Sequence, residues 1–314
     1  MIWPLMTPTS TLLSSVDKSW KQFASAWKKA RAKGSEKAVH DLRVSTRRLI
    51  ATLELAGAVS RDKELSGVQK QFKKVLKRMG PLRDVQVQLE NLSQIRAIDP
   101  VEEFKRSLER RERREIGRVT KDLKRRRRRG LSNEIHHIRA GFENPRKPVD
   151  DATVRHAIDS LVAIRHRAFW RARGRFKPAN PETLHNMRIA LKKLRYVIES
   201  AQPILGGWAR KRSREMHTCQ QLLGDARDLD ILKTRLEKWA HKKGKKVVEA
   251  VAPELAQLGR KRQRLATSIR KSSAHFEELV PVRKPRPKPK PDQEATQALP
   301  LHDVTSPVWV RTIH

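Results

Sequence analysis

Apolar residues recur at spacings of three and four along most of the chain, which is the pattern of amphipathic helices. Between Val16 and Val280, proline and glycine are scarce, while Leu, Ala, Arg, Lys and Glu dominate. The apolar stripes from Val101 to Leu123 and from Leu255 to Phe276 keep the helical period for several turns. No segment alternates convincingly between apolar and polar residues with a period of two. We therefore expect an all-α protein without a sheet.

Two proline-containing segments suggest how the chain is divided. Residues 143–151 contain Pro145 and Pro148, which disfavour a helix, followed by Asp150 and Asp151, which suit the start of the next one. Residues 281–291 alternate proline with Lys and Arg, a composition that favours polyproline II and cannot build a core. We expect an N-terminal extension over residues 1–15, two helical halves over residues 16–144 and 145–280, and a disordered basic tail over residues 281–314.

The two halves repeat a pair of motifs. The pattern H-x-x-R-apolar-x-x-[RK]-[RK]-apolar starts at His40 and again at His185. The pattern G-x-x-R-D-apolar-x-apolar starts at Gly80 and again at Gly224. Both motifs keep their order and nearly the same separation, so we infer an internal duplication. We expect each glycine to end one helix with a left-handed cap before the next helix begins.

At about 100° per residue, the cations and the histidine in each copy of the histidine motif fall on one face of a helix. The opposite face is apolar in both copies. It holds Leu42, Leu49 and Leu53 in the first half, and Met187, Leu191, Leu194 and Ile198 in the second. The candidate anion-binding residues of the two motifs are His40, Arg43, Arg47, Arg48 and Arg83, then His185, Arg188, Lys192, Lys193, Arg195 and Arg227.

The composition indicates an anionic partner. Lys and Arg number 71 against 34 Asp and Glu, a formal net charge of +37 at pH 7 that is spread over most of the chain. Arginine presents a planar fork to two phosphate oxygens, and lysine supplies a compact point charge. A bound polyanion would also raise the pKa of His40 and His185 by favouring the imidazolium form. Each motif helix therefore suits a linear chain of phosphates.

Simpler interpretations remain open for each motif. A basic helix face is often only solvated charge, and the histidines could serve hydrogen bonds within a helical bundle. Asp84 and Asp228 stand near the expected helix starts, where they could cap a helix or pair with a neighbouring arginine. In that case Arg83 and Arg227 need not contact a ligand. The repetition favours the binding interpretation for the motif helices.

The remaining composition narrows the class of protein. A single cysteine, Cys219, excludes an internal disulfide framework and fits a reducing compartment. We find no apolar run long enough for a membrane span and no basic segment of a secretory signal, so we expect a cytoplasmic location. We expect neither a cofactor nor a metal site. The sequence leaves the oligomeric state, the preferred ligand length and the role of the tail open.

The paired motifs resemble those of the CHAD domain, the conserved histidine α-helical domain, over roughly Val16 to Val280. The segment Leu194-Arg195-Tyr196 with Glu199 adds to the likeness, whereas Ile50 stands where the second copy has Arg195. The resemblance implies two pseudo-symmetric antiparallel four-helix bundles around a basic central channel that binds inorganic polyphosphate. It also implies association with polyphosphate granules, and ligand-binding roles for the histidines, arginines and lysines of the two motif helices.

We therefore expect a stand-alone, non-enzymatic protein that binds inorganic polyphosphate. A nucleic-acid-binding protein is the alternative, because the net charge suits it equally. The motif faces, however, offer few of the aromatic, Asn or Gln side chains that contact bases. Catalysis on polyphosphate is disfavoured, since no repeated carboxylate cluster that could hold magnesium accompanies the cations. The signature E-x-E-x-K of a triphosphate-processing CYTH partner is also missing from the chain.

Overall fold

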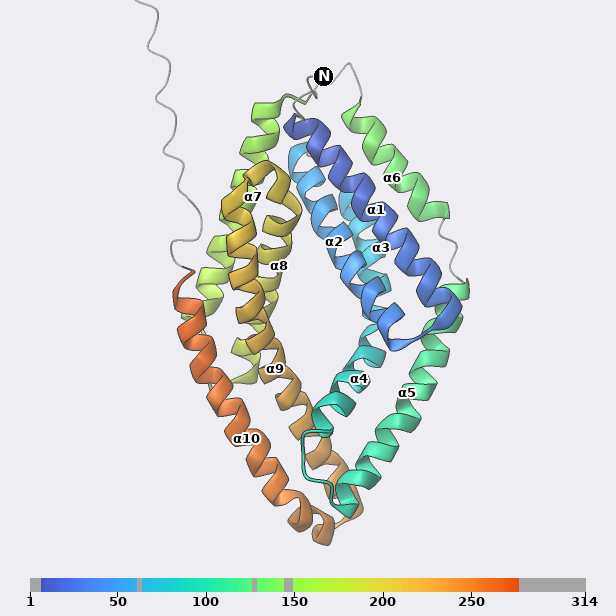
Figure 1. Cartoon of the computed structure of the whole chain (residues 1–314), viewed down its shortest axis with the longest axis vertical. Helices are drawn as coiled ribbons and strands as arrows, with labels where there is room; N and C mark the ends of the chain where they lie inside the picture. The colour runs from blue at the N-terminus through green and yellow to red at the C-terminus, as the bar shows by residue number, and fades with distance from the viewer. Residues whose placement is uncertain (1–6, 61–63, 126–128, 144–148, 277–314) are drawn as a thin grey trace, which may run out of the picture. The chain divides into compact units, whose positions relative to one another are not determined.

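The chain is described by a computed structural model covering residues 7–60, 64–125, 129–143 and 149–276 (Figure 1). These residues form ten helices and no strand, which confirms the all-α prediction. The helices are α1 (Pro8–Lys33), α2 (Glu36–Ser60), α3 (Glu64–Arg78), α4 (Gly80–Leu92), α5 (Asp99–Arg125), α6 (Arg129–Phe142), α7 (Asp151–Gly174), α8 (Pro181–Leu205), α9 (Gly207–Lys243) and α10 (Lys245–Ala274).

Residues Met1–Val280 form one compact unit. The predicted tail, residues 281–314, lies outside the described residues. The interior boundary lies partly outside them as well, since the described chain stops at residue 143 and resumes at residue 149. On its far side, the Asp150 carboxylate accepts a hydrogen bond from Thr153 N at 2.7 Å and caps α7, as its position predicted.

Helix α1 begins earlier than the expected start of the first half. Thr7 caps the helix by accepting from Ser10 N at 3.2 Å, and Pro8 stands in the first turn, where its missing N–H is harmless. Leu12, within the stretch expected as an extension, is 1% exposed and belongs to the main core. The first half therefore includes part of residues 1–15. None of the helices in the described ranges has the length and apolar character needed to cross a membrane.

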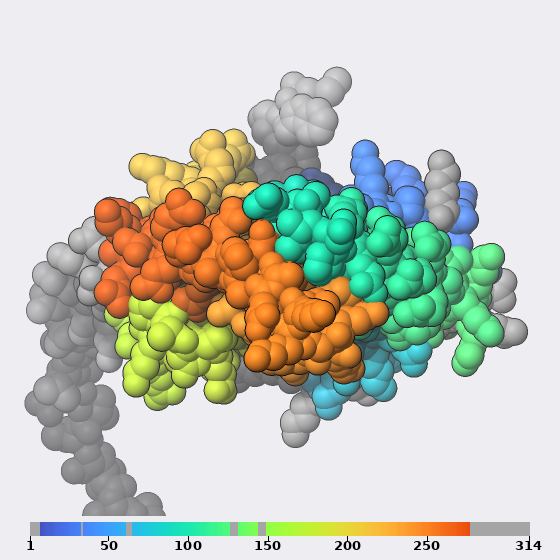
Figure 2. Space-filling view, turned by 90° about the horizontal axis from the view of Figure 1, so that it is seen from below, coloured from blue at the N-terminus to red at the C-terminus, as the bar shows by residue number. Residues whose placement is uncertain are grey.

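The two motif helices lie at the junction between the halves. Helix α1 packs on α2, α7 packs on α8, and α2 packs directly on α8 (Figure 1). The long helices α9 and α10 pair with each other, and α9 also contacts α4 and α5. Seen from below, the α10 residues in orange lie against the teal and green residues of the α4–α5 region (Figure 2). The first and second halves thus meet both at the motif helices and at the opposite end.

Both hydrophobic cores combine the two halves. The larger core joins the apolar faces of α1, α2 and α3 to those of α7, α8 and the first part of α9. The smaller core packs residues such as Phe104 and Leu108 of α5 against Leu232 and Leu236 of α9. Since each core contains residues from both halves, neither half has a complete core by itself. Burial of apolar surface supplies most of the stabilisation, so each half depends on the other. The division into two repeats remains a prediction.

The expectation that Gly80 and Gly224 end helices with left-handed caps is wrong. Gly80 is the first residue of α4, and Gly224 lies inside α9. The glycines with positive φ among the described residues are Gly34, Gly206 and Gly244.

The residue that follows each glycine explains why the two copies differ. Pro81 follows Gly80 and starts a new helix, because proline lacks an N–H and is best tolerated in a first turn. Asp225 follows Gly224, and the buried stripe of Cys219, Leu223, Ala226 and Leu229 stays in phase across it. A glycine inside such a helix costs about 1 kcal/mol relative to alanine but does not end it.

Candidate anion-binding site

The buried faces of α2 and α8 fix the direction of their polar faces. Leu42, Leu49 and Leu53 of α2 are 0% exposed, and so are the four predicted apolar residues of α8. This confirms the helical-wheel assignment of both apolar faces. Since α2 packs on α8, cations beside these buried stripes are brought toward the junction between the two helices.

Four cations from the two motif helices form what we call the central cluster: Arg43, Arg47, Arg188 and Lys192. Burial, followed by the charges of Arg47, Arg188 and Arg43, lowers the pKa of Lys192 to about 6. Burial and the charge of Arg47 also lower the pKa of Arg43, to which Arg188 contributes. The two copies of the motif thus place their cations close enough to repel one another across the junction.

Several donors in and beside the central cluster are buried without a protein partner. Among the described residues, Arg47 Nε, Arg188 Nε and His185 Nδ1 have no hydrogen-bond acceptor. Burial lowers the pKa of Arg47, and the charge of the nearby Tyr196 side chain opposes this shift. An unsatisfied buried donor costs about 1–3 kcal/mol, so native structures rarely leave one without water or a ligand. Phosphate oxygens would satisfy these donors and offset the repulsion at the same time.

The two histidines lie at the edge of the central cluster. His40 is exposed and lines a pocket of about 570 Å³ between α1 and α2, together with Lys21, Lys29 and Arg48. Burial and the charge of Arg83 lower the pKa of His40, and burial and the charge of Arg227 lower the pKa of His185. Without an anion, both imidazoles are therefore mainly neutral at pH 7, and a polyanion would shift each pKa upward.

Two of the predicted ligand residues are engaged by protein groups instead. Arg48 Nη2 of α2 lies 3.2 Å from Glu199 Oε1, and Arg195 Nη1 lies 3.1 Å from Glu199 Oε2. Arg195 is 9% exposed and also donates from Nε to Gln220 Oε1 of α9 at 2.9 Å. Glu199 thus links α8 to α2 through Arg48, and its pair with Arg195 lies within α8. Lys193 is exposed on the surface of α8.

The glycine-motif arginines lie next to the histidines. Arg83 forms ion pairs with Glu36 at 3.2 Å and Glu90 at 3.7 Å, and its charge lowers the pKa of His40. Arg227 acts in the same way on His185 and also lines a separate pocket.

The aspartates of the glycine motifs do not cap helices, so that interpretation is wrong. Asp84 follows the first turn of α4, and Asp228 lies inside α9, where backbone N–H groups are already used. Burial raises the pKa of Asp228 to about 6, although the charges of Arg188 and Arg83 oppose the shift. The charge of Asp84 acts on Arg43. Both carboxylates therefore lie near the cations and partly balance them.

A model of the CHAD domain family matches residues 14–237 of the chain. The chain belongs to the CHAD domain family. The crystal structure of the CHAD domain from the plant Ricinus communis has a TM-score of 0.69 and 17% identity, and the match covers 85% of this chain and 91% of that one. PptA from Streptomyces chartreusis has a TM-score of 0.63 and 16% identity, with 87% and 99% covered. The comparison with curated proteins found no match.

Within this CHAD domain, sequence reasoning missed the role of several residues. Tyr196 lies near Arg47 and opposes the lowering of its pKa by burial, and the paired aspartates lie beside the cations. For the aspartates, membership of a repeated motif was a signal in the sequence. The described residues contain no group of three or more His, Cys, Asp or Glu able to hold a metal. Cys219 is buried on α9, where burial raises the pKa of its thiol to about 11. The arrangement is suited to holding an extended anion.

Proposed function

We propose that this CHAD domain binds inorganic polyphosphate at the central cluster, as part of a basic channel between its two halves. The proposal rests on one observation: both copies of the motif bring their cations to one place, and two buried guanidinium donors there have no partner among the described residues. The CHAD family is linked to polyphosphate binding in general, which supports the same ligand.

The spacing of the cations favours a chain over a single phosphate. Arg43 and Arg47 are one helical turn apart, about 6 Å along the axis, and Arg188 and Lys192 repeat this spacing on α8. Successive phosphates of an extended chain can therefore face successive cations. A single orthophosphate would meet only one such level. In this proposal the protein holds the chain without a catalytic step and associates with polyphosphate granules in the cytoplasm.

Substitution of the central cluster tests the proposal. Arg47→Met and Lys192→Met remove one charge from each motif helix while keeping an unbranched side chain, and Lys74→Met removes an exposed charge from α3 as a control. We expect the double variant to weaken polyphosphate binding by about a hundredfold, because two charge-assisted contacts of over 1.4 kcal/mol each are lost. Fluorescence anisotropy with labelled polyphosphate measures the affinity, and circular dichroism confirms that helicity is kept.

Competition separates this proposal from its alternatives. We expect unlabelled polyphosphate to displace the labelled chain at a far lower concentration than duplex DNA of equal phosphate content. Equal displacement by DNA would point instead to a nucleic-acid-binding protein that uses overall charge. Release of orthophosphate from polyphosphate by the pure protein with magnesium, lost in the Lys192→Met variant, would show an enzyme.

A further inference from the structure

A second basic pocket lies between α9 and α10, beside the segment that precedes α8. We call it the α9–α10 pocket; its volume is about 650 Å³. The cations that line it are Arg227, Lys233, Arg235, Lys238 and Arg262. Asp230 and Glu237 are its acidic residues, so the lining carries an excess of three positive charges. Such an excess in a concave surface favours an anionic occupant.

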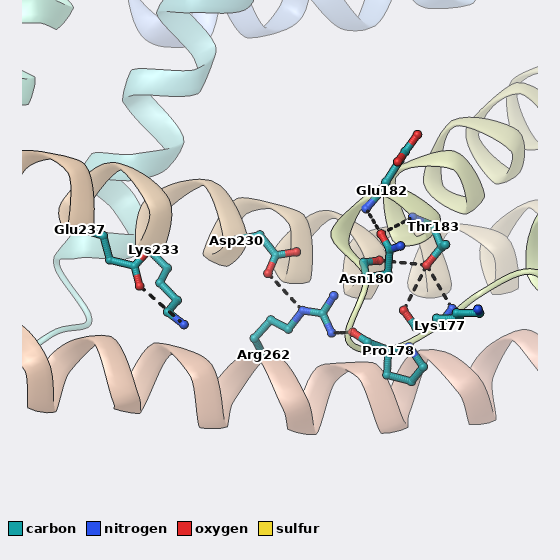
Figure 3. A network of polar contacts seen from close by, with 9 residues as sticks. All are labelled: Lys177, Pro178, Asn180, Glu182, Thr183, Asp230, Lys233, Glu237 and Arg262. Carbon is teal, nitrogen blue, oxygen red and sulfur yellow. Dashed lines mark hydrogen bonds and ion pairs between the residues drawn. The ribbon is translucent and has the colours of Figure 1, made fainter.

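The most informative residue of this pocket is Arg262, which is 8% exposed. Its Nε donates to Asp230 Oδ1 at 3.1 Å, and its Nη1 donates to the backbone carbonyl of Pro178. Figure 3 shows the guanidinium group between Asp230 on α9 and the turn at Pro178. Its Nη2 is buried and has no acceptor within the described part of the chain. A buried guanidinium with an unused donor is costly unless an acceptor completes it.

The other cations of the α9–α10 pocket are only partly balanced. Lys233 pairs with Glu237 at 3.7 Å, and Arg235 donates to Gln88 Oε1 of α4 at 2.8 Å. The Oδ1 atom of Asp230 accepts from Arg262, whereas its Oδ2 atom is buried without a hydrogen-bond partner among the described residues. Lys238 is exposed at the rim of the pocket. An incoming oxyanion would therefore find both the buried donor of Arg262 and the exposed cation of Lys238.

Arg227 connects this pocket with the central cluster. It lines the α9–α10 pocket. Burial is the main cause that lowers the pKa of His185, and the charge of Arg227 is the second. His185 in turn lies one helical turn from Arg188 of the central cluster. Arg227 therefore lies near His185 and lines the same pocket as Arg262, which places a cation between the central cluster and the α9–α10 pocket.

We propose that the α9–α10 pocket is a second phosphate-binding site, which holds phosphates of a polyphosphate chain that extends beyond the central cluster. This inference rests on the proposed function, since the chain must first occupy the central cluster. Phosphate oxygens accept hydrogen bonds from Arg262 Nη2, Arg227 and Lys238. A short chain fills the central cluster alone, whereas a long chain reaches both sites and gains affinity from the second.

The test compares two chain lengths on variants of the pocket. Arg262→Gln removes the buried donor, Lys238→Gln removes the rim cation without touching the core, and Lys242→Gln is the control, an exposed lysine of α9 outside the pocket. We expect the first two variants to weaken binding of long-chain polyphosphate by about tenfold, equivalent to 1.4 kcal/mol. Binding of tripolyphosphate stays unchanged, and Lys242→Gln matches the wild type. Isothermal titration calorimetry measures both ligands.

Each other outcome is decisive. Wild-type affinity for the long chain in both pocket variants would overturn the second site. Because Lys238 is exposed, a loss of affinity in its variant cannot be explained by misfolding. If the pocket variants weaken the binding of tripolyphosphate as much as that of the long chain, a short chain already uses the pocket. That result would also overturn the inference, in which the pocket binds only chains that extend beyond the central cluster. If the wild-type protein binds neither ligand, the proposed function fails, and the inference with it.

Discussion

At the scale of single residues, the cations of the central cluster repel one another, and an anionic ligand can reduce this repulsion. Lys192 is surrounded by arginines from both motif helices and is partly removed from water, so its pKa falls to about 6. The free protein therefore keeps this amine mainly neutral at pH 8. A polyphosphate chain in contact with Lys192 counters the repulsion from the arginines, because its negative charge favours the ammonium form.

Polyphosphate binding at pH 8 is accordingly expected to take up about one proton. The sign follows from the pKa of Lys192, which lies below pH 8 in the free protein and rises above it in the complex. Calorimetric titrations in two buffers of different ionisation enthalpy measure the number of protons. The Lys192→Met variant should lose most of this uptake, whereas Lys193→Met, altered at the neighbouring exposed lysine, should keep it. Identical heats in both buffers for the wild type would contradict the assignment.

At the scale of helices, Glu199 fixes how α2 and α8 meet. It accepts ion pairs from Arg48 of α2 and from Arg195 of its own helix, and Arg195 is nearly buried. Arg195 also stacks its guanidinium over Tyr196 at 4.5 Å from the ring centroid, and Tyr196 opposes the lowering of the Arg47 pKa by burial. The ion pairs around Glu199 thus hold Arg48 and Arg195 beside the central cluster.

Replacement of Glu199 by Gln separates this structural role from binding. We expect the free energy of unfolding to fall by about 2 kcal/mol, because Arg195 loses the carboxylate that balances its buried charge. Polyphosphate affinity should not fall, since the substitution removes a negative charge beside the site. Urea denaturation gives the stability. Glu249→Gln, which affects an exposed pair with Lys245 at 3.9 Å, should change it by under about 0.5 kcal/mol. Equal stability of the two variants would remove Glu199 from this role.

At the scale of the whole molecule, net charge and shared cores act together. The charge of +37 draws a polyanion to the protein from any direction, whereas the packing of α2 on α8 decides where the ligand is held. Because both hydrophobic cores join the two halves, the central cluster depends on the folding of the complete unit. Neither half by itself presents the four cations of that cluster.

Salt is expected to weaken polyphosphate binding steeply. By analogy with DNA, four phosphate contacts correspond to a loss of about a hundredfold in affinity between 50 and 200 mM salt, and contacts in the α9–α10 pocket would add to it. Anisotropy titrations of labelled polyphosphate over this range give the slope. The Arg47→Met/Lys192→Met variant should show a shallower slope, because it releases fewer counterions. A flat response in the wild type would contradict a ligand held by the central cluster.

Local patterns in the sequence carried much of the fold and the main part of the site. The period of apolar residues predicted the helices and the buried faces of α2 and α8, since it depends only on neighbouring turns. The repeated motif identified Arg43, Arg47, Arg188 and Lys192 as candidates. The likeness between Gly80 and Gly224 misled, because a single following residue, Pro81 or Asp225, decides whether the helix stops or continues.

The sequence by itself determined that this protein is helical, strongly basic and built with two copies of a cationic motif. Only the tertiary structure decided which of those cations meet. Arg48 and Arg195 share the motif but pair with Glu199, and Arg262 lies outside the motif yet holds a free donor in a pocket. The physical reason is that helix faces follow from local spacing, whereas ion pairs and buried donors depend on which helices pack together.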